Sequence, residues 1–350
     1  MTRTYRSACA VAAAILALTV TASAGPVPDR LDRFREIATS QLSAAQVLDT
    51  AAAAEAYRAA YELLDEEIVE SLGSGSVFSS TAFLQERLDA FSDAWGGASV
   101  RILRLGRFTV GVFQLGERAI GNSVRVYGRL RDEAALLTTM AREGRPSLYP
   151  LPPAASAVQF LVAWDGAPSG RGTSRPVRLE QVRQQGDGVH VVWSTANVYP
   201  DGLVARTYGV RGGELRVRYE LRYPGWVPGC DGQTEQEDLY RLGGATGTYA
   251  RVSQRQYDAW HRDMRAVAAR MFAAVTGGDR RALVDLVPDP RVRERLPAKL
   301  EPDPVCDAVS GTAGEQVSVA ASDERGAPWA LTLQRAGARW RVTSAAPVIP

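Results

Sequence analysis

The stretch LVARTYGVRGGELRVRYELRY, residues 203–223, decides the fold of the central part of the chain. In its second half, apolar residues alternate strictly with arginine and glutamate; the apolar members are Leu215, Val217, Tyr219, Leu221 and Tyr223. Side chains of a strand point alternately to opposite faces, so this period of two predicts a β-strand with one buried face. Arg211-Gly212-Gly213 has the composition of a tight turn, and residues 203–210 supply a partner strand. The stretch therefore predicts an antiparallel hairpin.

Further strands are expected on both sides of this hairpin, over residues 100–105, 108–115, 124–130, 158–164, 177–182, 189–195 and 239–242. Turn signals such as Asp165-Gly166 and Asp187-Gly188 separate them. Residues 131–142 predict a short helix within this meander, and the proline-rich residues 146–153 predict a loop. We therefore expect an antiparallel β-rich domain over residues 98–246.

The N-terminal region has the period of a helix. Apolar residues recur at steps of three and four, with acidic residues between them, at Tyr57, Tyr61, Leu64, Ile68 and Leu72. This helix is expected to start near Asp29 and to end at the glycine-serine break 73–76. A second helix carries Leu84, Leu88, Phe91 and Trp95 and ends at Gly96-Gly97. The pattern predicts a helical hairpin over residues 25–97.

The helical period returns in the C-terminal part. Apolar residues from Tyr257 to Val275 predict a long helix, a shorter helix follows Asp279, and strands are expected at 316–321, 329–334 and 339–344. This order, with Thr276-Gly277-Gly278-Asp279 after the long helix and Arg339-Trp340-Arg341-Val342 in the last strand, resembles the nuclear-transport-factor-like superfamily of cystatin-like cone folds over residues 255–346.

The resemblance implies a curved sheet wrapped on a helix with a pocket, and it transfers no catalytic residue. The superfamily includes small-ligand isomerases and exported accessory domains without chemistry. We therefore expect a cone-like α+β domain over residues 250–350. The predicted fold class is α+β, with an N-terminal helical hairpin, a central antiparallel β-sheet and a C-terminal small α+β cone-like domain.

Residues 1–24 have the pattern of a cleavable signal peptide. Arg3 and Arg6 precede an apolar run over 7–20, and Ala22-Ser23-Ala24 supplies the small residues of a cleavage site near Ala24. The apolar run is shorter than the roughly 20 residues that cross a bilayer. The sequence therefore predicts a periplasmic or secreted protein with no integral membrane span after cleavage.

The charge balance excludes a basic footprint for nucleic acid. The chain has 41 basic and 39 acidic residues, and cleavage of the leader removes two arginines and no acid. The remaining charge is close to zero, so we expect no nucleic-acid partner. The predicted partner is an envelope protein or a small ligand whose identity the sequence does not give.

Two cysteines remain after the leader, Cys230 and Cys306. Export places them where disulfides persist, so we expect a bridge between the middle and the C-terminal part of the chain. The alternative is two separately buried thiols.

Few chemistries remain open to this sequence. The histidines are His190 and His261, and neither has a nearby acidic or thiol partner at ligand spacing, so no metal site is expected. No nucleophile motif and no phosphate-binding glycine loop occurs. We therefore predict no catalytic residue and no cofactor.

The densest polar cluster, residues 230–238, follows an aromatic loop that holds Trp226. Glu235, Glu237 and Asp238 are its candidate binding residues, and a carboxylate-dependent hydrolase would use them as acid and base. Alternatively, the cluster has a structural role, as a surface loop that is held by a disulfide and leads into the strand 239–242. Trp226 either closes the edge of the core or stacks on a sugar or peptide.

We expect a non-catalytic accessory or binding protein of the cell envelope. The alternatives are the carboxylate hydrolase and a small-molecule carrier that uses the C-terminal domain. The carrier requires an apolar cavity lined by Trp260, Met264 and Met271.

Overall fold

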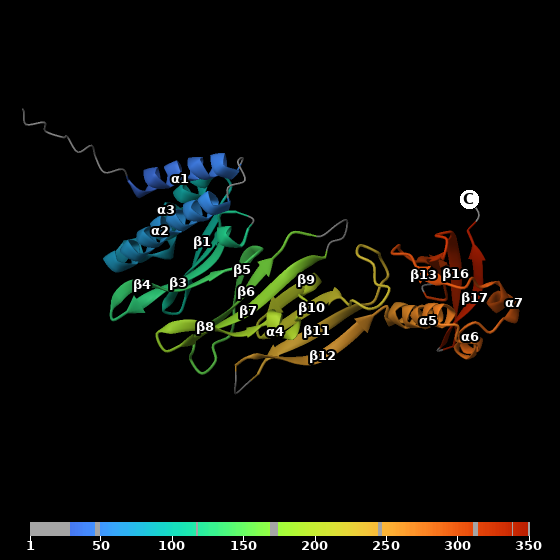
Figure 1. Ribbon diagram of the computed structural model, residues 1–350. Helices are drawn as coiled ribbons and strands as arrows, with labels where there is room; N and C mark the ends of the chain where they lie inside the picture. Colours follow the sequence, from blue (N-terminus) through green and yellow to red (C-terminus); the bar gives the residue numbers. More distant parts are fainter. Residues whose placement is uncertain are drawn as a thin grey trace, which may run out of the picture.

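The computed structural model describes residues 29–45, 50–116, 118–168, 174–243, 247–310, 314–337 and 339–348. The predicted signal peptide, residues 1–24, lies outside these ranges. Three parts follow one another along an elongated molecule: a helical layer on a first sheet, a second sheet, and a C-terminal α+β unit (Figure 1). Helices and antiparallel sheets occupy separate parts of the chain, which confirms the predicted α+β class.

The N-terminal layer consists of α1 (Arg30–Ala45), α2 (Thr50–Ser74), the 3₁₀ helix η1 (Ser76–Ser79) and α3 (Thr81–Trp95). The sequence predicted one helix where the structure has α1 and α2. The division lets Phe34 of α1 pack against Phe91 and Trp95 of α3, with ring centroids 5.0 Å and 5.3 Å apart. Ser80 caps α3 by accepting a hydrogen bond from the Phe83 backbone, as a serine at a helix start does.

The first sheet has the order β1-β2-β3-β4, formed by β1 (Ser99–Leu105), β2 (Phe108–Gln114), β3 (Asn122–Leu130) and β4 (Glu133–Ala141). Strand β2 is buried on both faces. Phe113 packs against the helices, whereas Val110 and Val112 pack against the second sheet. The first sheet is therefore the middle layer between the helices and the second sheet.

The helix predicted over residues 131–142 is wrong, because β4 occupies this segment. Arg131 and Asp132 both have positive φ, 52° and 68°, between the paired residues Leu130 and Glu133. Two such residues form the kind of two-residue turn that matches the twist of a hairpin. Pairing with β3 then overrides the helical propensity of the alanines and leucines in β4.

The second sheet has eight strands in the order β12-β11-β10-β9-β7-β6-β5, with β8 paired to β7. They are β5 (Arg145–Pro150), β6 (Gln159–Asp165), β7 (Arg175–Gln185), β8 (Gly188–Ser194), β9 (Val204–Arg211), β10 (Glu214–Glu220), β11 (Glu235–Leu242) and β12 (Tyr249–Tyr257). The short helix α4 (Thr195–Val198) follows β8.

The hairpin predicted over residues 203–223 is β9 and β10, with Leu215 opposite Val210 and Val217 opposite Tyr208. Strand β10 ends at Glu220, three residues before the predicted end. Two further expectations are corrected. Residues 146–150 of the expected loop belong to β5, whose prolines are tolerated because β5 is an edge strand. Strand β12 was not predicted, since its polar residues lack the alternation of a half-buried strand.

The C-terminal unit packs α5 (Ala259–Thr276) on a five-stranded antiparallel sheet. Its other elements are α6 (Arg280–Leu286), α7 (Pro290–Arg295), β13 (Leu300–Pro302), β14 (Ala308–Ser310), β15 (Gln316–Asp323), β16 (Pro328–Ala336) and β17 (Arg339–Pro347). Cys230 and Cys306 form a disulfide between the second sheet's β10–β11 connection and this unit, with Cα atoms 5.4 Å apart.

None of the helices among the described residues combines the length and the apolar composition that a membrane crossing requires.

Candidate functional site

Strand β11 begins at Glu235, so the three carboxylates predicted as candidate site residues lie within the second sheet. The expected surface loop leading to a strand at 239–242 is therefore wrong from Glu235 onward. The register pairs Glu237 with Arg218 of β10. Side chains alternate along a strand, so Glu235 and Glu237 share one face and Asp238 lies on the other.

Glu235 is buried by two arginines. The guanidinium groups of Arg206 and Arg218 each bind one of its carboxylate oxygens. Arg218 also lies over the ring of Tyr257, 4.0 Å from its centroid. On the same face, Tyr257 donates a long hydrogen bond of 3.5 Å to Glu237. Both carboxylate oxygens of Glu235 therefore have arginine partners. This pairing explains why β11 can begin at an acidic residue in a charged stretch of the sequence.

Asp238 is fully buried on the opposite face, among tyrosine hydroxyl groups. Tyr199 and Tyr219 donate to its Oδ2 atom at 2.8 Å and 3.3 Å. Arg251 reaches the same oxygen at 3.2 Å, and Gln236 donates to Oδ1 at 3.0 Å. Burial raises the pKa of both tyrosines above the usual value, so the hydroxyl groups remain donors at neutral pH. Asp238 is the centre of a satisfied polar core.

The structure does not bring the three carboxylates together at one cavity. An acid and a base must approach a single bound molecule from the same space. Glu235 and Asp238 face opposite sides of the sheet, and neither of the two cavities described below is lined by them.

Trp226 is half-buried in the loop between β10 and β11. The Arg222 guanidinium lies 5.4 Å from the centre of its ring. Gln233 holds the loop closed, since its amide accepts from the Val227 backbone at 2.9 Å and donates to the Cys230 carbonyl at 3.2 Å. Trp226 is thus half-buried in a loop held by hydrogen bonds, and its Nε1 atom is buried without a hydrogen-bond partner among the described residues.

A buried polar cluster beside the disulfide had no role in the sequence analysis. The Tyr223 hydroxyl lies 2.6 Å from Nδ1 of His261, whose Nε2 lies 3.0 Å from Asp307 Oδ2. Arg265 also binds Asp307. The signal that could have found the cluster is Cys306, because a bridge to Cys230 brings the neighbouring Asp307 to the β10–β11 connection, which also holds Tyr223. These contacts join the second sheet to the C-terminal unit, and the other oxygen of Asp307, Oδ1, is buried without a hydrogen-bond partner among the described residues.

Within the described ranges, no three His, Cys, Asp or Glu side chains gather as a metal ion requires. Met264 and Met271, expected to line a carrier cavity, are fully buried in the close-packed core under α5, and Trp260 packs beside them. Both cavities described below lie elsewhere.

The strongest candidate site is a cavity of about 540 Å³ between the ends of α2 and η1, the first sheet and the β7–β8 turn. Figure 1 shows these elements in the part of the molecule away from the C-terminal unit. We call it the arginine pocket. It is lined by Leu72, Ser79, Arg104, Arg107, Thr109, Gly128, Arg129, Arg131, Asp132, Ala134 and Asp187. Four arginines against two aspartates give the lining an excess of positive charge.

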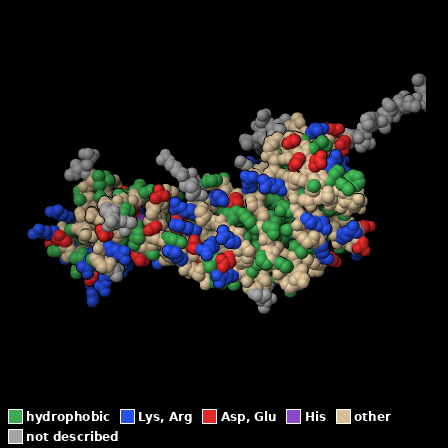
Figure 2. Space-filling model, turned by 180° about the vertical axis from the view of Figure 1, so that it is seen from behind, with side chains coloured by type: hydrophobic (Ala, Val, Ile, Leu, Met, Phe, Trp, Pro, Cys, Tyr) green, Lys and Arg blue, Asp and Glu red, His purple; other side chains and the backbone are tan. Residues whose placement is uncertain are grey.

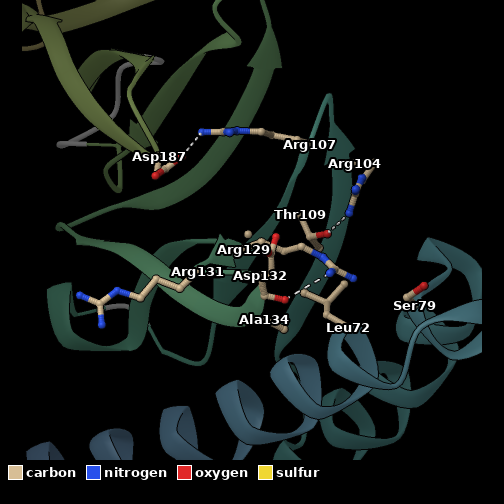
Figure 3. A pocket seen from close by; sticks show the side chains of 11 residues that line it. Leu72, Ser79, Arg104, Arg107, Thr109, Arg129, Arg131, Asp132, Ala134 and Asp187 are labelled. Carbon is tan, nitrogen blue, oxygen red and sulfur yellow. Dashed lines mark hydrogen bonds and ion pairs between the residues drawn. The ribbon is translucent and has the colours of Figure 1, made fainter.

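Tertiary structure assembles this pocket from turns that are distant in sequence. Arg104 and Thr109 are opposite each other on β1 and β2, and the register through β3 places Arg129 on the same helix-facing side of the sheet. Figure 3 shows Arg104 and Arg129 directed into the same space, whereas Arg131 is directed away from it. Arg107 is directed to the turn between β7 and β8, where it binds Asp187 at 3.1 Å.

In the described ranges, the hydrogen bonds of the Arg104 and Arg129 guanidinium groups go to uncharged oxygens. Arg104 donates to the Gly106 carbonyl at 3.1 Å and to the Thr109 hydroxyl at 3.0 Å. Arg129 donates to the Asp132 carbonyl at 3.2 Å. Among the described residues, no carboxylate lies within 4.0 Å of either guanidinium. Both side chains are exposed and keep donors for another partner.

Arg125 on the same strand shows the contrast. Its guanidinium binds the carboxylate of Asp65 on α2 and lies 4.4 Å from the ring centre of Tyr61. Tyr127 donates to the other oxygen of Asp65 at 2.7 Å. The helical layer therefore supplies a carboxylate to Arg125, whereas its residues in the wall of the arginine pocket, Leu72 and Ser79, carry no charge.

A second cavity of about 630 Å³ lies between α3, the edge strand β1 and the edge strand β5. The Gln85 side chain of α3 binds the β1 edge there, donating to the Val100 carbonyl and accepting from the Ile102 amide, both at 2.9 Å. This amide satisfies the edge in the way a neighbouring strand would.

Positive charge elsewhere is dispersed. Figure 2 shows arginine and lysine side chains along the length of the molecule, interleaved with acidic and apolar ones. This distribution gives no continuous basic stripe on the face in view.

Comparison with known proteins gives little guidance. No family model and no curated protein matches the chain. A solved structure from Bacteroides uniformis, assigned as a 6-phosphogluconolactonase, shares 10% identity over 71% of this chain and 73% of its own, with a TM-score of 0.16. A score this low shows no common fold and carries no argument.

Proposed function

We propose that this protein is a non-catalytic binding protein, exported to the cell envelope, that takes an anionic group in the arginine pocket. The observation that carries the proposal is the pair Arg104 and Arg129, which face one cavity without a carboxylate partner in the described parts of the chain.

Arginine chemistry defines the class of ligand. A planar guanidinium presents parallel N–H donors that match the oxygens of a phosphate or carboxylate. The cavity of about 540 Å³ is within the usual size range of small-ligand sites. The Thr109 hydroxyl between the two arginines adds a neutral hydrogen-bonding group. We therefore propose a ligand that bears a phosphate or carboxylate.

A binding experiment tests this site. Inorganic phosphate, titrated into the protein, is expected to shift the Nε–Hε NMR signals of Arg104 and Arg129 to saturation. The double variant Arg104→Gln/Arg129→Gln should bind at least about a hundredfold more weakly, because each of the two lost charged hydrogen bonds contributes on the order of 1.5 kcal/mol or more. Arg216→Gln is the matched control, since Arg216 is an exposed strand arginine outside the pocket. Equal affinity of the double variant and the wild type would refute the proposal.

Export is supported by the leader pattern and by the bridge between Cys230 and Cys306. Mass spectrometry of the protein recovered from its own cells, without reductant, is the test. We expect a chain that begins near Gly25 and carries the bridge. An intact chain from the cytosol with free thiols contradicts export.

A further inference from the structure

Exposed apolar side chains adjoin the arginine pocket. Val77 and Phe78 of η1 are 68% and 51% exposed, among the most exposed large apolar residues in the described parts of the chain. Phe78 rests edge-on against Phe83 of α3, with ring centroids 5.2 Å apart. We call Val77, Phe78 and Phe83 the apolar tip. Contiguous exposed apolar side chains are a feature of interaction surfaces.

The tip and the pocket share a wall. Ser79, the residue after Phe78, lines the pocket, and so does Leu72 at the end of α2. Through Ser79, the tip therefore adjoins the wall of the cavity that Arg104 and Arg129 also line. One surface thus combines apolar side chains, which are stabilised by transfer out of water, with guanidinium cations, which attract an anion.

We propose that this surface docks the protein on an anionic lipid membrane, with Val77 and Phe78 entering the interface and lipid phosphates bound by Arg104 and Arg129. The inference rests on the proposed function and names its ligand as the headgroup of an anionic lipid. Charge complementarity supports this occupant, because anionic leaflets attract basic clusters near their surface.

The geometry of the tip fits shallow insertion. The side chains of η1 project from a turn whose backbone is held by its own contacts: the Ser79 hydroxyl donates to the Ser76 carbonyl at 3.0 Å, and the Ser80 amide donates to the Val77 carbonyl at 3.1 Å. Its backbone polar groups are thus partly satisfied before docking. Such peripheral binding depends on buried apolar area together with attraction to anionic lipid.

Vesicle sedimentation tests the inference. Wild-type protein is expected to bind vesicles of phosphatidylglycerol and phosphatidylcholine, and to bind pure phosphatidylcholine about 25-fold more weakly, since two arginines each contribute on the order of fivefold at an anionic surface. Raising the salt concentration should weaken binding to the anionic vesicles, because screening reduces the attraction.

The variant Val77→Ser/Phe78→Ser should lose about tenfold of its vesicle affinity, because a buried Phe side chain contributes on this order, while its affinity for inorganic phosphate stays unchanged. Val284→Ser is the matched control, since Val284 is 52% exposed on α6. Both substituted tip residues are exposed, so the variant should keep the wild-type fold. Urea unfolding checks this.

The outcomes separate the two proposals. If the tip variant binds vesicles as tightly as the wild type, or if the wild type binds phosphate and no vesicles, membrane docking is overturned and the proposed function stands. If Arg104→Gln/Arg129→Gln keeps full affinity for both phosphate and vesicles, both proposals fail.

Discussion

Arg265 of α5 and Asp307 form an ion pair of 2.7 Å in which both side chains are 3% exposed. The pair stands beside the disulfide, and His261 binds the same carboxylate oxygen of Asp307. Tyr223, at the end of the second sheet, completes the chain of contacts through His261. The junction between the second sheet and the C-terminal unit is therefore polar, buried and built around one carboxylate.

Removing that carboxylate should destabilise the junction. We expect Asp307→Ala to lower the free energy of unfolding by about 3–5 kcal/mol, because it leaves the Arg265 charge buried without its partner. Asp263→Ala is the control, since Asp263 is 62% exposed and pairs loosely with Arg262 at 3.6 Å; it should change stability by less than about 0.5 kcal/mol. Urea unfolding measures both, and equal losses would contradict the role of the junction.

The disulfide closes a loop of 76 residues in sequence separation. The double variant Cys230→Ser/Cys306→Ser should be less stable by about 4 kcal/mol, because the unfolded chain regains the conformations that the bridge excludes. Guanidinium unfolding with and without reductant provides the comparison. Reduced wild type should match the double variant, and a stability that does not respond to reductant would count against the bridge.

Asp238 and Glu237 are neighbours on β11 with opposite surroundings. Asp238→Ala should cost about 3 kcal/mol or more, because it leaves Arg251 and the hydroxyl of Tyr199 without their buried acceptor. Glu237→Ala removes only a contact of 3.5 Å and should cost less than about 0.5 kcal/mol. Thermal unfolding of the two variants measures both losses of stability. A larger loss for Glu237→Ala than for Asp238→Ala would show that the assigned faces of β11 are wrong.

Tyr249 carries a buried hydroxyl with no hydrogen-bond partner among the described residues, and burial raises its pKa to about 12 from 10.0. Between these values the folded protein keeps a proton that the unfolded chain releases, so this contribution to stability is complete below pH 10 and is lost as the pH rises through 12.

We expect Tyr249→Phe to be more stable than the wild type by about 1 kcal/mol at neutral pH, because it removes an unsatisfied buried group. Its advantage should grow between pH 10 and 12. Unfolding measured as a function of pH checks both points, and a constant difference over this interval would exclude Tyr249 as the titrating group.

Asp132 occupies the turn between β3 and β4 with a φ of 68°, a conformation that glycine adopts without a steric penalty. Asp132→Gly should stabilise the protein by about 0.5–1 kcal/mol, and it should also strengthen phosphate binding by removing an acidic group from the arginine pocket. Glu133→Gly, one residue into β4, is the control and should destabilise. Weaker phosphate binding by Asp132→Gly would contradict the electrostatics proposed for the pocket.

Local pattern predicted the elements whose partners are close in sequence. The alternation around Leu215 and Val217 and the adjacent glycine turn define β9 and β10, because a hairpin needs only a two-sided strand and a tight connection. The steps between Leu84 and Trp95 define α3 in the same way. Segment 131–142 was mistaken for a helix because its alanines and leucines suit both structures, and pairing with β3 decided between them.

The site required long-range information. Arg104 and Arg129 are ordinary arginines in a chain that contains many, and neither has a motif around it. Their special feature is that no carboxylate among the described residues lies within 4.0 Å of either guanidinium, which depends on how the sheet and the helical layer pack together. The carboxylates of 235–238, which do form a pattern in sequence, are taken up by arginines and tyrosines from other strands.

The sequence by itself determined the α+β class, the β9–β10 hairpin and the pairing partners available to the two cysteines, since these follow from the side-chain period and from residue identity. The tertiary structure alone decided which charges are neutralised. Strand register and helix length decide whether a guanidinium has a carboxylate partner within a few ångströms. The sequence around Arg104 and Arg129 indicates neither the register nor the helix length.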